Sequence, residues 1–484
     1  RLARAGQRVW LLERGRELHP GEFPDSLPEA LANGHLSSKG NSIGSPTGLF
    51  DLRTFDDMNV LVGCGLGGTS LINANVSLRA EPAVFQRDRW PDELKAADAL
   101  DAGYSRAEKM LQPRSVPADL GLPKLDALRR GARSLPATEF FRPPINVTFD
   151  DGPNAAGIEQ HACTMCGDCV AGCNVGAKNT VLMNYLPDAV AHGAKVFTKV
   201  SVHHLSRAGD RWRVHFHLME TGREVFDDAA LEVTADVVVL SAGTLGSTEI
   251  LLRSRDIGLS DRLGTSFTGN GDVLAFSYNG DDAVHGIGWG TRRDDRPLVG
   301  PCISGAAMVT DGPLEEHMIV EEGAIPSGMA ALLPTAFAIS DALDGIDLDP
   351  TVLDEFSELG RQAASLLRGP YTGALDNTMT YLVMAHDDAD GTLELVDDRV
   401  RIVYPGVSDK PIFKQIQANL EAASTPLGGE YVRNPLAQEL LGENQITVHP
   451  LGGCPMGRDH ATGVVNHKGQ VFDRADPTSV HNGL

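Results

Sequence analysis

Residues 59–73 read NVLVGCGLGGTSLIN, a strand-like apolar run that breaks into a glycine-dense loop. Four of the six residues from Gly63 to Gly68 are glycines. Because glycines carry no side chain, the backbone N–H groups of such a loop can approach a bulky anionic or aromatic ligand. Thr69 and Asn73 add hydrogen-bonding groups. The pattern favours a ligand-binding loop over a tight turn whose glycines serve only positive φ.

A second strand-like run, VWLL at residues 9–12, ends at Glu13. A helix, a turn and a parallel strand that ends in an acidic residue are typical of the βαβ unit of dinucleotide-binding proteins. There the acid accepts hydrogen bonds from the adenosine ribose. The companion glycine fingerprint is expected about 20 residues earlier, before Arg1. The alternative is an ordinary exposed glutamate before a turn.

The remaining patterns predict a mixed α/β chain. The run at 236–240, which is continuously apolar after Asp236, predicts a strand buried on both faces. Residues 15–60 and 113–160, rich in glycine, proline and polar side chains, predict irregular structure. The other expected elements are helices at 92–112, 184–193, 244–254 and near 351–368, a strand at 195–202 and a hairpin at 211–233.

Composition narrows the classes of function. The chain has 484 residues, of which 42% are hydrophobic, and this length suits two domains. With 42 basic and 65 acidic side chains, the net charge of −23 disfavours nucleic acid and anionic membrane surfaces. No apolar run is long enough to span a bilayer. The cysteines do not form a secreted disulfide framework, so we expect a reducing, cytoplasmic compartment.

Four of the seven cysteines form the series Cys163-x-x-Cys166-x-x-Cys169-x-x-x-Cys173, the spacing of a bacterial ferredoxin loop. Clustered thiolates favour a soft metal centre, so a [4Fe–4S] cluster or zinc is one hypothesis. Two features weaken it: Asn174 replaces the proline expected after the fourth cysteine, and the chain has no second copy of the series. Free thiols or local disulfides are the alternative, and no residue is assigned as a metal ligand.

Three motifs together resemble the glucose–methanol–choline (GMC) oxidoreductase family, in particular its cholesterol-oxidase branch. They are GLGGTSLIN at 65–73, VLSAGTLGST at 239–248 and HPLGGCPMG at 449–457. The resemblance implies an α/β fold in which a doubly wound, Rossmann-like FAD domain is interleaved with a substrate domain built on an antiparallel sheet. The implied boundaries are 1–80, 174–275 and 445–484 for the FAD domain, 81–173 for a Pro-rich and Cys-rich excursion, and 276–444 for the substrate domain.

The resemblance also implies the residues of the cofactor site. Glu13 would bind the ribose, and Val202 would meet the adenine through its backbone. The loop residues would line the pyrophosphate and the flavin; they are Gly67, Gly68, Thr69 and Asn73.

His449 is the expected catalytic residue, beside the substrate hydroxyl. Hydride can leave a carbinol carbon for flavin only if the hydroxyl proton is removed or strongly hydrogen-bonded, and an imidazole near neutral pKa suits that task. The alternative is a histidine at a strand end that forms only local hydrogen bonds and has no catalytic role. Residues 319–328, IVEEGAIPSG, are similar to the region where cholesterol oxidases place a glutamate over the sterol, which moves a ring proton during isomerisation. This implies a catalytic role for Glu321, with Glu322 as a competitor and a surface acid pair as the alternative.

We therefore expect an FAD-dependent enzyme that oxidises the CH–OH group of a hydrophobic alcohol, with a sterol as the first candidate. Oxygen or another electron acceptor would reoxidise the flavin. A flavin and iron–sulfur electron-transfer protein and a non-catalytic flavoprotein remnant are the alternatives. The resemblance places further FAD-domain segments before Arg1 and after Leu484, so residues 1–484 alone are expected to bind FAD poorly.

Overall fold

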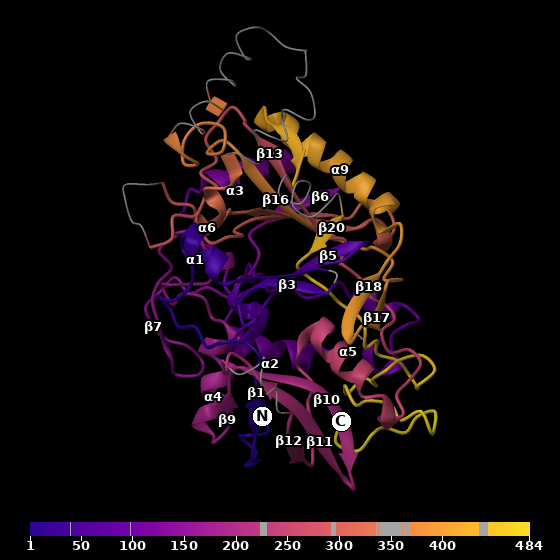
Figure 1. Ribbon diagram of the computed structural model, residues 1–484. Coiled ribbons are helices and arrows are strands. Elements are labelled where there is room, and N and C mark those ends of the chain that lie inside the picture. Colours follow the sequence, from indigo (N-terminus) through magenta and orange to yellow (C-terminus); the bar gives the residue numbers. More distant parts are fainter. Residues whose placement is uncertain are drawn as a thin grey trace.

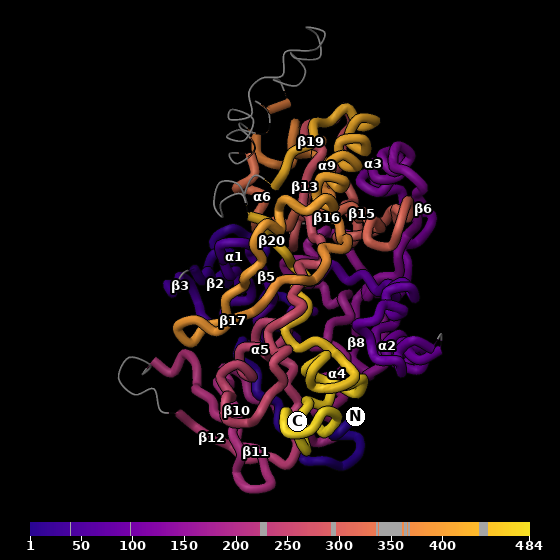
Figure 2. The backbone as a smooth tube through the Cα atoms, turned by 90° about the vertical axis from the view of Figure 1, so that its right-hand side faces the viewer, coloured from indigo at the N-terminus to yellow at the C-terminus, as the bar shows by residue number. Residues whose placement is uncertain are grey.

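The computed structural model runs from Arg1 to Leu484 and describes most of this chain. The positions left out are 39, 97, 223–229, 292–296, 335–336, 338–360, 363–364, 366–367 and 435–443. The helix expected near 351–368 lies largely outside the described residues, as does the middle of the hairpin expected at 211–233. The described residues include a six-stranded sheet and a three-stranded sheet. Figures 1 and 2 show that these sheets lie at opposite ends of the molecule, and that both termini lie at the end of the smaller sheet.

The larger sheet is antiparallel, in the order β19-β13-β16-β15-β14-β6. Its strands are β19 (Glu430–Arg433), β13 (Val273–Tyr278), β16 (Met379–Ala385), β15 (Met318–Gly323), β14 (Ala306–Val309) and β6 (Thr138–Phe141). Helices α3 (Pro123–Ala132) and α9 (Pro411–Ser424) pack against it and bury apolar faces in the main core. Strand β6 comes from the stretch expected to be a separate excursion, so that stretch contributes to this sheet.

The prediction of irregular structure at 113–160 is wrong for α3. Pro123 stands at the start of the helix, where its missing N–H costs no intrahelical bond. Leu125 and Leu128, three residues apart, face the core. The apolar stripe is only two turns long and is flanked by prolines, which hides it in the sequence.

A second sheet has the order β20-β5-β4-β2-β3. Its strands are β20 (Gln445–Thr447), β5 (Met58–Gly63), β4 (Phe50–Thr54), β2 (Gly34–Ser38) and β3 (Asn41–Gly44), and α1 (Leu27–Ala32) precedes it. The prediction of irregular structure at 15–60 is therefore wrong as well. The sequence does not reveal these strands because they are short and only partly apolar. β20 and β5 are parallel, with Thr447 opposite Val60. Their carboxyl ends therefore deliver the glycine loop and His449 to the same edge.

The other end of the molecule holds the parallel pair β1 (Trp10–Leu12) and β9 (Lys195–Phe197). Beside it lies the antiparallel series β10 (Val200–Ala208), β11 (Arg211–Leu218) and β12 (Leu231–Ala235). Helix α5 (Gly243–Arg253) packs on β10. The parallel strand that leads to Glu13 is thus present, as the sequence predicted.

Residues 236–240 do not form the strand expected there. Val237 and Val239 are 58% and 66% exposed, whereas Val238 and Leu240 pack against an apolar cluster. Among the described residues, no strand pairs with this segment; the Val238 N–H donates to the carbonyl of Gly483 at 2.7 Å. A continuous apolar run therefore does not guarantee burial on both faces.

The described residues also form other helices and strands. They are α2 (Asp101–Leu111), α4 (Tyr185–Ala191), α6 (Ser327–Ala330), β7 (Gly152–Pro153), β8 (Glu159–Gln160), β17 (Thr392–Val396) and β18 (Arg399–Val403). In the part of the chain that the structure describes, no helix has the length and apolar character needed to cross a bilayer.

Candidate functional site

Two motifs from distant parts of the chain meet beside the end of β20. His449 lies two residues beyond that strand, and Pro450 accepts a hydrogen bond from the Thr244 hydroxyl at 2.7 Å. Thr248, one turn further along α5, lies against Gly453, where an added Cβ would be 2.2 Å from its hydroxyl oxygen. The segment 239–248 therefore packs directly on the histidine motif.

Asp272 holds His449 in place. Its carboxylate accepts from the ring Nδ1 of His449 at 2.9 Å and from the backbone N–H of the same residue at 3.1 Å. The Thr447 hydroxyl and the Val448 N–H also donate to it, each at 2.9 Å. Asp272 is almost completely buried, so the carboxylate is fixed by four donors.

This contact sets the protonation of the ring. Because a carboxylate only accepts, Nδ1 must carry the proton, and Nε2 of the neutral imidazole has a free lone pair. Burial alone would lower the pKa of His449, but the hydrogen bond and charge of Asp272, with a smaller effect of Glu321, raise it above its ordinary value. The side chain is 40% exposed, so it can still reach a ligand.

Glu321 is the second predicted residue at this site. It lies on β15 and is almost completely buried, and its Oε1 has no hydrogen-bond partner among the described residues. Burial raises its pKa to about 8, and the charge of His449 lowers that pKa in part. The carboxyl group is therefore mostly protonated at pH 7.

Glu322 points to the opposite face of β15, as strand alternation requires. There it forms a buried ion pair with Lys124 and accepts from the backbone N–H groups of Ser304 and Gly305 at 2.7 and 2.9 Å. Its hydrogen-bonding capacity is used inside the fold. Of the two acids, only Glu321 has a buried carboxyl oxygen without a hydrogen-bond partner among the described residues.

Glu13 and Val202 flank the end of the parallel pair β1–β9. Glu13 exchanges backbone hydrogen bonds with Phe197 and Val200, each at 2.8 Å, which brings it to the start of β10 and so to Val202. Its Oε1 accepts from the Gly15 N–H at 2.7 Å, and burial raises its pKa. The structure thus brings the two predicted adenosine contacts together.

The glycine loop packs against the same corner. An added Cβ on Gly15 would be 2.4 Å from the Gly65 nitrogen, so the two segments touch through backbone atoms. Gly68 has φ of 59° and open space where a side chain would stand. Thr69 closes the loop by accepting from the Gly63 N–H at 3.0 Å, and the Asn73 side chain is exposed.

These observations fit FAD. The open space at Gly68 is a cradle that a Cβ would fill, and Glu13 stands at the end of a parallel strand where a ribose can be bound. The assignment of Glu13, Gly67, Gly68, Thr69, Asn73 and Val202 to individual cofactor atoms stays a prediction.

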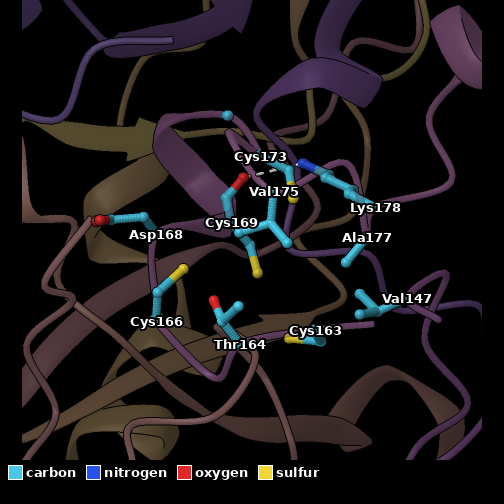
Figure 3. A pocket seen from close by; sticks show the side chains of 12 residues that line it. Val147, Cys163, Thr164, Cys166, Asp168, Cys169, Cys173, Val175, Ala177 and Lys178 are labelled. Atoms are coloured by element: carbon cyan, nitrogen blue, oxygen red, sulfur yellow. Dashed lines mark hydrogen bonds between the residues drawn. The ribbon is translucent and has the colours of Figure 1, made fainter. Parts of the chain in front are cut away.

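The cysteine loop lies against the glycine loop. The Lys178 ammonium is buried and donates to the carbonyls of Leu71, Asn73 and Cys169 at 2.9, 2.7 and 2.9 Å. Burial lowers its pKa to about 8. Figure 3 shows Lys178 entering the pocket that the four cysteines line.

Sequence reasoning missed two residues of this region, Asp272 and Lys178. Asp272 follows Asn270 and Gly271, which both have φ of 59°, and a Gly-Asn-Gly-Asp turn before a strand is a signal that could have marked it. Lys178 follows the cysteine series and the Gly176-Ala177 pair. No general sequence pattern predicts that a lysine in this position is buried.

Comparison with known proteins gives a consistent result. Two family models described as GMC oxidoreductase match residues 52–268 and 411–476. A cholesterol oxidase of Mycobacterium tuberculosis is 26% identical, and the alignment covers 98% of this chain and 82% of that protein. A cholesterol oxidase of Acinetobacter baumannii is 29% identical over 49% of this chain and 46% of the relative. A long-chain-alcohol oxidase of Arabidopsis thaliana is 25% identical over 66% of this chain and 43% of the relative.

One solved structure is similar over almost the whole chain. It is an FAD-dependent oxidoreductase from Chaetomium thermophilum, with a TM-score of 0.50, 14% identity, and coverage of 99% of this chain and 92% of that one. At this identity the likeness concerns the fold alone, an FAD domain combined with a sheet domain.

Proposed function

Because this chain belongs to the GMC oxidoreductase family, whose members use FAD to oxidise alcohols, we propose that its substrate is a hydrophobic secondary alcohol, with a sterol as the first candidate. The observation that carries the proposal is the pair formed by His449, fixed by Asp272, and the buried, unpaired carboxyl group of Glu321. A histidine alone can accept the hydroxyl proton of any alcohol, so it does not distinguish one class of alcohol from another. A second acid that is mostly neutral at pH 7 is useful where a proton on the substrate carbon skeleton must also move.

The oxidation needs one proton acceptor from this chain. FAD, when bound, supplies the hydride acceptor for the carbinol hydrogen. Nε2 of His449 accepts the hydroxyl proton as the C=O bond forms, and Asp272 stabilises the resulting imidazolium. Glu13 and the glycine loop hold the cofactor, and the edge shared by β5 and β20 brings that loop and His449 to one place.

Glu321 has the chemistry for a second step. Its pKa of about 8 puts it close to the range in which a carboxyl group both takes and returns a proton near neutral pH. We assign it to the movement of a ring proton in the ketone product. The similarity to cholesterol oxidases, which extends over nearly the whole chain for one relative, supports this choice over a straight-chain alcohol.

Oxygen is the proposed electron acceptor, because the relatives named above are oxidases. The cytoplasmic location expected from the sequence stays a prediction.

A substrate screen of the FAD-loaded protein tests the proposal. Sterols, long-chain alcohols, sugars and choline are compared by flavin bleaching without oxygen and by peroxide release with oxygen. We expect sterols to give the highest kcat/KM. The His449→Asn variant should retain the flavin spectrum and lose about 100-fold or more in turnover of the best substrate. A higher kcat/KM for sugars or choline, or near-normal turnover in the variant, would contradict the proposal.

A further inference from the structure

The cysteine loop at residues 163–173 takes no part in the proposed oxidation, yet it surrounds a pocket of its own. We propose that this loop binds a cubane-type iron–sulfur cluster. The ligands are Cys163, Cys166, Cys169 and Cys173. Each thiol loses its proton as its sulfur bonds to iron, which leaves a cluster held by four thiolates.

The sulfur atoms face a common space. Figure 3 shows the sulfurs of Cys163, Cys166 and Cys169 turned toward the middle of the pocket, with Cys173 on the side where Lys178 enters. All four line the same pocket, and none of them is in a disulfide. In the fold, therefore, the free thiols are grouped around a space and are not used up in crosslinks.

The arrangement does not fit a single metal ion. Four sulfurs on one zinc ion lie about 4 Å from one another, because each Zn–S bond is about 2.3 Å long. In the described part of the chain, no three His, Cys, Asp or Glu side chains are arranged to hold one ion. A cubane places irons and sulfides between its thiolates, so its ligands stand farther apart. The ferredoxin-like spacing of the loop favours this larger centre.

The loop is held in shape by its surroundings. Met165 and Gly167 have positive φ, at 63° and 82°, which bends the backbone around the pocket. The carbonyl of Cys166 accepts from the Trp289 N–H at 3.0 Å, so a neighbouring segment supports the bend. A loop that is fixed from outside while its sulfurs face inward is typical of a preformed ligand shell.

Two sulfurs already accept backbone hydrogen bonds. The Met165 N–H donates to Cys163 Sγ and the Cys302 N–H donates to Cys169 Sγ, each at 3.4 Å. Hydrogen bonds to ligating sulfurs stabilise thiolate charge and help to set the potential of such clusters.

Asn174 stands where a ferredoxin loop has proline, and the structure gives it a different task. Its side chain accepts from the N–H groups of Gly21 and Phe23, both at 2.9 Å, and donates to the Phe23 carbonyl at 2.9 Å. Gly172 packs on the Phe23 ring so closely that an added Cβ would be 2.1 Å from it. The end of the loop is thus fixed by tertiary contacts, and the absence of proline does not weaken the site.

Charge complementarity also supports the site. Lys178 is fully buried, and its ammonium contacts three carbonyl oxygens. A cluster with four thiolates carries net negative charge, which this buried cation offsets. Because the same ammonium binds Leu71 and Asn73, the cluster would lie against the loop proposed to line the flavin.

Metal and sulfide analysis of the full chain tests the proposal independently of any enzyme activity. The protein is purified without oxygen, and a second sample is reconstituted with Fe²⁺ and sulfide. We expect three to four irons and a matching amount of acid-labile sulfide per chain, visible absorbance near 400 nm that dithionite bleaches, and a paramagnetic resonance signal after reduction. Fewer than about 0.3 iron per chain in both samples, or stoichiometric zinc without sulfide, would overturn the proposal.

A serine scan identifies the ligands. Cys166→Ser and Cys169→Ser should each reduce cluster iron at least fivefold. Cys454→Ser is the matched control, because Cys454 lies in a different apolar cluster and contacts Thr248, and its iron content should equal that of the unchanged protein. Equal iron content in all three variants would exclude this loop as the cluster site. If a variant fails to fold, the iron and sulfide content of the unchanged protein still shows whether a cluster is bound.

Discussion

Asp272 accepts hydrogen bonds from both the backbone N–H and the ring Nδ1 of His449, at 3.1 and 2.9 Å. The two residues are 177 positions apart and are joined because β13, which follows Asp272, lies near β20, which precedes His449. This contact fixes the direction of the ring and determines which nitrogen is free to accept a proton.

The Asp272→Asn substitution should slow alcohol oxidation about 10-fold or more, because the amide no longer stabilises an imidazolium. Burial lowers the pKa of His449 and Asp272 more than offsets this effect, so removal of the carboxylate charge should lower that pKa. A proton acceptor works when it is unprotonated. The acid limb of the kcat/KM profile should therefore move to lower pH in the variant, as measured by steady-state kinetics from pH 5 to 9.

The His285–Asp376 pair provides the control. Its Nδ1 to Oδ1 distance is also 2.9 Å, but it lies outside the candidate site. Asp376→Asn should leave the pH profile in place. If both variants shift the profile equally, or neither does, Asp272 is not the positioning residue of His449.

The Glu321→Gln substitution should separate the two proposed steps. Oxidation should stay within about 10-fold, whereas isomerisation of the ketone product should fall about 100-fold or more. Since burial raises the pKa of Glu321 to about 8, its carboxylate form increases as pH rises toward that value. Isomerisation by the unchanged protein should rise with pH over the same range. Chromatography of the products measures both; isomerised product formed at the normal rate by the variant would remove Glu321 from the mechanism.

The features that sequence predicted correctly are local. The strand ending at Glu13 and helix α5 each follow from a short, strong apolar pattern. The glycine loop follows from four glycines in six positions. His449 could be selected because a whole motif surrounds it, and its catalytic role and that of Glu321 stay predictions.

The features that sequence missed depend on distant contacts. Asp272 can be recognised as the partner of His449 only once β13 and β20 are known to be close. Which of Glu321 and Glu322 lies at the candidate site depends on the face of β15 that each occupies. Residues 236–240 have the composition of a buried strand, but pairing depends on the neighbours that the fold supplies. No periodicity within these segments encodes such information.

The Lys124→Met substitution should lower the free energy of unfolding by about 3–5 kcal/mol, because it leaves the Glu322 carboxylate buried without its cation. Both side chains are fully buried, so water does not screen the loss. Adding Glu322→Leu should recover most of the stability, since apolar side chains can replace a buried ion pair. Urea denaturation followed by tryptophan fluorescence measures both variants.

An exposed ion pair gives the comparison. Arg130 and Asp282 are 43% and 65% exposed, and Asp282→Asn should cost less than about 1 kcal/mol. A Lys124→Met variant no less stable than this control would show that the buried pair does not hold α3 against β15.

The Glu13→Gln substitution tests the ribose site. Glutamine can still accept from the Gly15 N–H, so the local turn should persist, but the charge-assisted hydrogen bonds to ribose hydroxyls are lost. We expect FAD affinity to fall by about 1.5–3 kcal/mol, roughly 10- to 100-fold in Kd. Glu17→Gln, in which an acid that is 46% exposed is neutralised four residues later, should leave Kd unchanged. Titration of the deflavinated protein with FAD, followed by flavin fluorescence, gives both values. Equal affinity in the two variants would place the ribose elsewhere.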